Sequence, residues 1–133
     1  MRVFLDANVL FSASNAGSNI AKLIHLLLQT NHVLTSDLAV EEARRNIVRK
    51  RPAWSDQFEG LVKGIEVVRS ISFALPVPLA EKDVPILCAA IAARCRYFVT
   101  GDRQDLGHLY DRAVGGVTII SLLRLAQILC TSG

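Results

Sequence analysis

Arg2-Val3-Phe4-Leu5-Asp6-Ala7-Asn8 is the stretch that decides the fold, because a short apolar run ends there in a carboxylate followed by an amide. A continuous apolar run bounded by polar residues is typical of a buried strand. Asp6 would then stand at the carboxyl end of that strand, the edge where parallel α/β sheets bind ligands. A carboxylate in this position is costly unless it is paired, hydrogen-bonded or bound to a metal.

Outward from this stretch, strand-like and helix-like segments alternate along the chain. Ser36 or Asp37 and later Ser121 are typical helix caps, while Pro52 and Gly64 are typical helix stops. The alternation predicts an α/β fold, a three-layer α/β/α sandwich with a five-stranded, mainly parallel sheet, in a single domain covering residues 1–133. The predicted strands are residues 3–5, 32–35, 65–72, 97–100 and 117–120, and the predicted helices are 20–29, 36–50, 54–63, 83–95 and 121–129, with a short helix start at 8–14 and a loop or short helix at 101–107.

The composition favours a globular protein and is compatible with an anionic partner without indicating one. A chain of 133 residues that is 51% hydrophobic can bury a real core, which argues against disorder. Its net charge is +3, and most of its basic residues are arginines, which suit phosphate. This charge is compatible with binding to nucleic acid. The sequence shows no targeting signal and no long apolar stretch free of charge, so we expect a cytoplasmic protein without a membrane span.

The three cysteines, Cys88, Cys95 and Cys130, form an odd set without a CxxC pair. We interpret all three as small core residues in a reducing compartment. Cys88 and Cys95 are seven positions apart and would share one face of the predicted helix. The scattered histidines and these cysteines do not form a zinc-binding pattern.

Acidic residues follow the predicted strands or open the predicted helices at several places. Because helix starts and the carboxyl ends of parallel strands share one edge of the sheet, these acids can converge. Converging carboxylates repel one another unless protons or a divalent cation neutralise them, and oxygen ligands favour Mg²⁺ or Mn²⁺. An ion of this kind activates water and polarises a phosphoryl oxygen. The candidates are Asp6, Glu42, Asp83 and Asp102, with Asp105 three residues further on.

Each acid also has an ordinary structural interpretation, which the sequence leaves open. Asp83 lies two residues before Pro85 and could be a helix N-cap. Asp102 and Asp105 could be turn residues. A glutamate near the start of the helix at 36–50 could lie on a solvated face, as Glu41 would if it paired with the arginine four residues on.

Four motifs together resemble the PIN-domain family, and within it the VapC-like toxin components of toxin–antitoxin pairs. The resemblance covers nearly the whole chain, and its most specific part lies between residues 83 and 106. The motifs are Asp-x-Asn at 6–8, Glu-Ala-Arg-Arg-Asn-Ile at 42–47, Asp-Val-Pro-Ile-Leu-Cys-Ala-Ala-Ile-Ala at 83–92, and Tyr-Phe-Val-Thr-Gly-Asp-Arg-Gln-Asp-Leu at 97–106.

The resemblance implies a Mg²⁺- or Mn²⁺-dependent ribonuclease that hydrolyses RNA phosphodiesters, with an antitoxin partner and a homodimeric state. By motif, its acidic quartet would be Asp6, Glu42, Asp83 and Asp102; its metal ligands would be Asp6, Asp83, Asp102 and the accessory Asp105; and Asn8 and Thr100 would orient the carboxylates. Glu41 competes with Glu42, which we prefer because Ile47, five residues on, matches the apolar spacing of the family. Whether one metal or two would act stays open, and Asp102 is a candidate to deprotonate the attacking water.

Basic residues follow the helical glutamate and are candidates for contacts with the RNA backbone. Their alternative is a solvated helix face paired to Glu41 and Glu42, and the sequence does not decide between the two. The candidates are Arg44, Arg45 and Arg49, followed by Lys50 and Arg51.

Two rival functions remain at this point. The motifs at 6–8 and 101–105 faintly resemble those of haloacid dehalogenase-like phosphatases. That family requires a second aspartate where Asn8 stands, and a lysine upstream of the last acidic motif, which is absent here. A non-catalytic PIN domain that binds RNA or a partner protein is the second rival, and the intact quartet argues against it.

Overall fold

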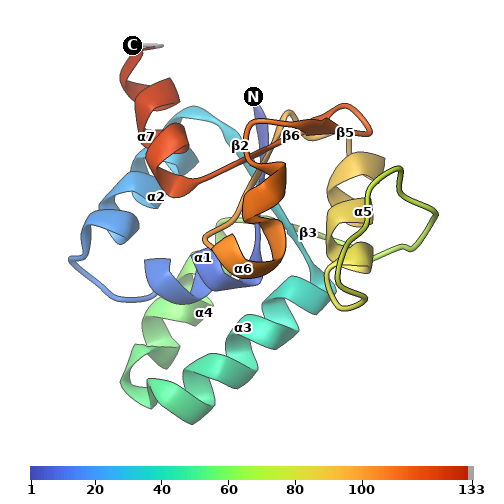
Figure 1. Ribbon diagram of the computed structural model, residues 1–133. Coiled ribbons are helices and arrows are strands. Elements are labelled where there is room, and N and C mark those ends of the chain that lie inside the picture. The colour runs from blue at the N-terminus through green and yellow to red at the C-terminus, as the bar shows by residue number, and fades with distance from the viewer. Residues whose placement is uncertain (132–133) are drawn as a thin grey trace.

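A six-stranded sheet organises the protein in the computed structural model, which describes residues 1–131. The strand order is β3-β2-β1-β4-β6-β5, and every neighbouring pair is parallel except β5 and β6, which are antiparallel. The first strand of the chain therefore lies inside the sheet (Figure 1). The strands are β1 (Arg2–Leu5), β2 (His32–Ser36), β3 (Glu66–Val68), β4 (Tyr97–Val99), β5 (Ala113–Val114) and β6 (Val117–Ile120).

Helices cover both faces of this sheet, as the alternation in the sequence predicted. In Figure 1, α2 and α7 lie on one side of the strands and α5 lies on the other. The predicted α/β fold with a mainly parallel sheet is confirmed. None of the helices within residues 1–131 is both long and apolar enough to cross a membrane. The helices are α1 (Ala7–Ala13), α2 (Asn19–Thr30), α3 (Asp37–Lys50), α4 (Ser55–Lys63), α5 (Val84–Ala92), α6 (Arg103–Leu106) and α7 (Leu122–Thr131), with short 3₁₀ helices η1 (Pro52–Trp54) and η2 (Gly107–Leu109).

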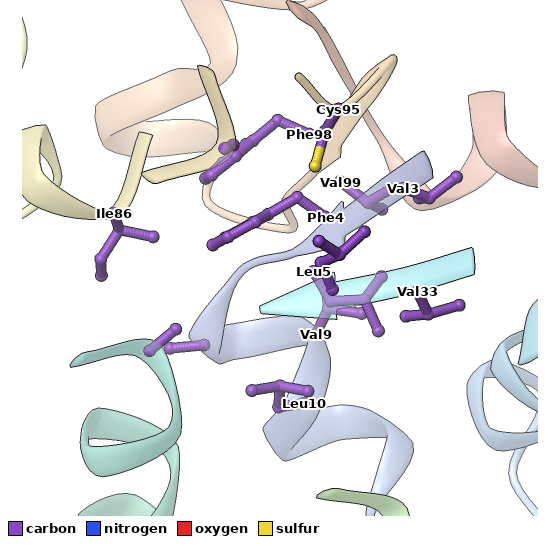
Figure 2. Close-up of a cluster of buried hydrophobic side chains, with 14 of the residues drawn as sticks. Val3, Phe4, Leu5, Val9, Leu10, Val33, Ile86, Cys95, Phe98 and Val99 are labelled. Atoms are coloured by element: carbon purple, nitrogen blue, oxygen red, sulfur yellow. The ribbon is translucent and has the colours of Figure 1, made fainter. Parts of the chain in front are cut away.

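The core is built around β1, which is buried on both faces. Phe4 stacks on Phe98 of β4 with ring centroids 5.3 Å apart and an interplanar angle of 11°. Figure 2 shows this pair beside Ile86 of α5, with Leu5 and Val9 on the other side of the strand. A strand covered by helices on both faces has no place for alternating polar residues, which explains the continuous apolar run before Asp6.

Two strands differ from the prediction. The strand predicted at 65–72 is only Glu66–Val68, because the chain then turns toward the start of α3. There the Asp37 carboxylate accepts hydrogen bonds from the Ser70 amide (2.9 Å) and hydroxyl (2.7 Å). The sixth strand, β5, was not predicted; it returns to β6 through Gly115 and Gly116, both at positive φ, which makes a tight hairpin.

The cysteine interpretation is correct for two residues and wrong for the third. Cys88 and Cys95 are buried, whereas Cys130 is exposed on α7. The helix predicted at 83–95 also ends early, at Ala92, and Arg94 follows with a φ of 57°. Cys95 therefore reaches the core from the turn before β4 and not from a shared helix face.

Candidate active site

A pocket of about 270 Å³ lies at the carboxyl ends of the central strands and contains the predicted acidic quartet. Asp6 directly follows β1 and is the N-cap of α1, Glu42 projects from the second turn of α3, Asp83 precedes α5, and Asp102 precedes α6. In Figure 1, α1, α3 and α6 lie together below the sheet, on the side toward which β1 runs. The topology thus brings together residues that are up to 96 positions apart in the chain. The pocket is lined by Asp6, Asn8, Glu42, Asn46, Lys82, Asp83 and Asp102.

Asp6 is held rigidly by three hydrogen bonds. Its Oδ1 accepts from the Ala7 amide (2.8 Å), while Oδ2 accepts from the Thr100 hydroxyl (2.8 Å) and the Asn8 side-chain amide (3.1 Å). Burial nevertheless raises the pKa of Asp6 to about 6, and the nearby Glu42 carboxylate raises it further against these hydrogen bonds. The buried charge is therefore only partly compensated by the protein, and a cation or a proton would stabilise it.

Thr100 and Asn8 join the ends of β1 and β4. The Thr100 hydroxyl accepts from the Asn8 side-chain amide (3.2 Å) and from the Asp102 backbone amide (3.1 Å). The Asn8 carbonyl oxygen in turn accepts from the Gly101 amide at 2.7 Å, and a Cβ at position 101 would crowd that oxygen at 3.2 Å. Tyr110, which the sequence analysis did not single out as a site residue, donates its hydroxyl to the Thr100 carbonyl at 2.9 Å.

Asp83 occupies the N-cap position of α5, but its side chain makes no capping hydrogen bond. Pro85, the second residue of the helix, has no amide hydrogen to offer, which removes one of the usual partners of a cap. Within residues 1–131, the buried Asp83 Oδ2 has no hydrogen-bond partner. Burial raises the pKa of Asp83 to about 6; the Lys82 ammonium lowers it, and the carboxylates of the pocket raise it. The capping interpretation therefore does not account for this side chain.

Asp102 does cap a helix, and it also belongs to a cluster of three carboxylates. Its Oδ1 accepts from the Asp105 amide at 3.0 Å, so the turn interpretation holds for its local structure. Asp83, Asp102 and Asp105 each offer one oxygen, and these three atoms lie within 4.8 Å of one another. The oxygen donors and the unpartnered oxygen of Asp83 together fit a hard divalent cation such as Mg²⁺ or Mn²⁺. Asp6 lies in the same pocket but outside this group of three.

Lys82 and Asn46 also line the pocket, and neither was predicted as a site residue. Lys82 places its ammonium 3.5 Å from Asp105 Oδ2. The carboxylates around it, Asp83 above all, raise the pKa of Lys82. Asn46 follows Glu42 by four residues on α3, and that helical spacing could have found it.

The structure separates the two glutamates and the three arginines of α3. Glu41 lies on the exposed side, 3.5 Å from Arg45, whereas Glu42 faces the acid pocket. Arg44 turns away toward α4, where its Nη2 donates to both carboxylate oxygens of Glu59 (2.6 and 3.2 Å) and its Nε donates to Oε1 (3.1 Å). A second pocket of about 300 Å³ borders the first, since both include Glu42 and Asn46; Arg45 and Arg49 complete its lining.

Among the comparisons with known proteins, the comparison with solved structures agrees with this architecture. Neither a protein-family model nor a curated protein matches the sequence. The structure is similar to a chain of VapBC2 from Rickettsia felis, solved bound to a DNA fragment from their promoter, with a TM-score of 0.65. The match covers 91% of this chain and 98% of the other at 14% identity, so it shows a shared fold. The resemblance inferred from the motifs is therefore confirmed at the level of the fold: this chain has a PIN-like fold, which it shares with the matched VapBC2 chain.

Proposed function

We propose that this protein is a metal-dependent endoribonuclease that hydrolyses RNA phosphodiesters, and that it is the toxin of a toxin–antitoxin pair. The observation that carries the proposal is the buried, unpartnered oxygen of Asp83 beside the carboxylates of Asp102 and Asp105. Burying several like charges without a counter-ion is unfavourable, so this arrangement has a physical reason only if a cation or substrate completes it. The PIN-like fold supports the same conclusion.

In this proposal, Asp83, Asp102 and Asp105 hold the divalent ion, and Asp6 and Glu42 complete the acid pocket. Bound there, Mg²⁺ or Mn²⁺ would supply Lewis-acid polarisation of the phosphoryl oxygen and activation of water. The raised pKa values of Asp6 and Asp83, both about 6, are consistent with carboxylates that await a cation. Asn8 and Thr100 keep Asp6 in one orientation through the hydrogen bonds described above.

The reaction is the hydrolysis of one P–O ester bond. The oxygen of water forms a new bond to phosphorus, the bond to the leaving oxygen breaks, and that oxygen takes up a proton. We assign Asp102 as the group that accepts the proton of the attacking water, since it lies in the pocket and is only partly buried. Arg45 and Arg49, in the adjoining pocket, would bind a neighbouring phosphate of the RNA, whereas Arg44 is already paired with Glu59.

The test is cleavage of single-stranded RNA in the presence of Mn²⁺. We expect wild-type protein to cleave and EDTA to stop it, and we expect Asp6→Asn, Asp102→Asn and Glu42→Gln each to abolish cleavage without loss of the fold. Glu41→Gln is the matched control, because this substitution removes the same charge from the exposed side of α3. Full activity in Asp6→Asn or Asp102→Asn would overturn the site. Turnover of p-nitrophenyl phosphate would favour the phosphatase alternative.

The toxin assignment has its own test. The matched protein is a VapB–VapC complex, which supports an antitoxin partner for this chain. We expect expression to arrest growth and co-expression of the neighbouring antitoxin gene to restore it. Normal growth with confirmed folded protein would count against the toxin role while leaving the nuclease intact. Light scattering during gel filtration would test the proposed homodimer.

A further inference from the structure

Lys82 is the one cationic residue among the described residues that line the acid pocket. Its ammonium lies 3.5 Å from Asp105 Oδ2, which is beyond the usual 2.7–3.2 Å of a hydrogen bond and makes this a loose ion pair. The Lys82 side chain is also 59% exposed. A loose, exposed pair contributes little free energy and is easily exchanged for a stronger one.

The carboxylate that Lys82 contacts is also one of the three that converge on the candidate metal position. Asp105 shares that position with Asp83 and Asp102, whose oxygens lie within 4.8 Å of its own. The Lys82 ammonium and a divalent ion therefore compete for the same negative charge. Since Lys82 is bonded directly to Asp83 in the chain, its side chain stays at the mouth of the pocket after an ion has taken its place.

We propose that Lys82 is a displaceable counter-cation: it neutralises part of the acid cluster before a divalent ion binds, and afterwards it binds a phosphate of the RNA. The second half rests on the proposed ribonuclease function, while the first half does not. An ammonium group carries three donors and suits a phosphate oxygen as a point charge. The displaced side chain still lines the pocket and is exposed, so it can reach a phosphate of an RNA bound there.

Two titrations test this, with Lys82→Met as the variant. Lys63→Met is the matched control, since it removes the same charge from the last turn of α4, away from the lining of the acid pocket. Calorimetry with Mn²⁺ alone measures metal affinity. Fluorescence anisotropy with labelled single-stranded RNA at saturating Mn²⁺ measures RNA affinity, in an Asp6→Asn background that leaves the cluster of three carboxylates unchanged.

We expect the two affinities to move in opposite directions. Lys82→Met should bind Mn²⁺ roughly twofold to fivefold more tightly than wild type, because a competing cation is gone. It should bind RNA about tenfold more weakly, because a charge-assisted phosphate contact is lost. Lys63→Met should change neither by more than about twofold, and Lys82→Arg, which retains the charge, should stay near wild type. A merely structural role would weaken both affinities together.

Equal or weaker Mn²⁺ binding by Lys82→Met would overturn the counter-cation, and RNA affinity equal to that of Lys63→Met would overturn the phosphate contact. If circular dichroism shows that Lys82→Met does not fold, Lys82→Gln, which also removes the charge, takes its place, and the same two comparisons apply to it. If Lys82→Met binds Mn²⁺ more tightly than wild type, as expected, but wild type cleaves no RNA, the ribonuclease proposal is wrong and the counter-cation role of Lys82 stands. Absence of Mn²⁺ binding in every variant would overturn both.

Discussion

The two edges of the central sheet treat charge in opposite ways. At the amino ends of the strands, His32 contacts Glu66 at 2.8 Å and Arg2 at 3.1 Å, and Arg2 also donates to the Ala93 carbonyl at 2.9 Å. At the carboxyl ends, the acids Asp6 and Asp83 are buried beside other carboxylates, and one oxygen of Asp83 has no partner. The His32–Glu66 pair at the amino ends joins partners of opposite type and is about half exposed, whereas the carboxyl ends bring buried side chains of one charge together.

This difference separates charges that serve the fold from charges that serve a ligand. At the amino edge, His32 contacts both Arg2 and Glu66, so these three side chains have partners within the chain. The acid pocket raises the pKa of two carboxyl groups to about 6, which means that the folded protein disfavours their charged forms. Groups perturbed by burial and by like charges in a pocket are typical of functional sites. The following predictions test whether the two edges differ in this way.

The largest expected effect is on catalysis. We expect Asp83→Asn to reduce Mn²⁺-dependent RNA cleavage by at least about a hundredfold, because it removes a candidate metal ligand while keeping the shape of the side chain. Glu66→Gln, at the opposite edge, should change the rate by less than about twofold. Single-turnover cleavage assays with both variants measure this contrast. Equal losses in the two variants would show that the edges are not functionally distinct.

The second effect is on stability and its dependence on pH. The folded-state pKa of Asp83, about 6, is above the ordinary value of 3.8, so its burial favours the protonated form. Its contribution to stability is fully present below about pH 3.8 and is lost as the pH rises through about 6. As the pH rises from about 3.8 to about 6, the free energy of unfolding of the metal-free wild type should therefore fall by roughly 1–3 kcal/mol relative to that of Asp83→Asn.

Urea denaturation of the two metal-free proteins at several pH values between 4 and 7 measures this difference. Glu66→Gln is the control, and its stability should follow the pH dependence of the wild type. If the free energies of unfolding of Asp83→Asn and wild type depended on pH in the same way, burial would not raise the pKa of the Asp83 carboxyl group. Adding Mn²⁺ should stabilise wild type more than Asp83→Asn, because the ion binds the folded state.

The third effect concerns the arginines beside the acid pocket. We expect the double variant Arg45→Ala/Arg49→Ala to bind RNA about tenfold more weakly and to reduce the slope of log K against log salt by about two. Arg44→Ala, on the same helix, should leave both unchanged, because Arg44 pairs with Glu59 and lies over the Phe58 ring at 5.4 Å. Anisotropy at three salt concentrations distinguishes them. An equal loss for Arg44→Ala would indicate a wider basic surface.

The smallest effect belongs to the amino edge. The side chains of His32 and Glu66 are each 47% exposed, and such pairs contribute up to about 1 kcal/mol. Glu66→Gln should therefore lower the free energy of unfolding at pH 7 by less than about 1 kcal/mol. Chemical denaturation checks this value. A larger loss would mean that the amino edge is more important for the fold than its exposure suggests.

Much of the fold could be predicted because local patterns carry it. The apolar run of β1 indicates a strand that is buried on both faces. Ser36 and Ser121 indicate helix starts, and the hydroxyl of each accepts a hydrogen bond from the backbone amide three residues further on. The antiparallel β5 was missed although Gly115 and Gly116 mark a hairpin turn. The end of β3 could not be predicted from local pattern, because Ser70 leaves the sheet to bond Asp37, 33 positions earlier in the chain.

The candidate site divides in the same way. By itself, the sequence placed Asp6, Asp83 and Asp102 at one edge of a parallel sheet, because strand ends and helix starts meet there whatever the details of packing. Only the tertiary structure decided that Glu42 faces the pocket while Glu41 faces outward, that Arg44 is already paired, and that Lys82 enters the pocket. These outcomes depend on contacts between α3, α4 and the segment before α5, which no local pattern records. The lone oxygen of Asp83 likewise follows from burial by the assembled fold, and burial is what turns an ordinary helix-capping aspartate into a candidate metal ligand.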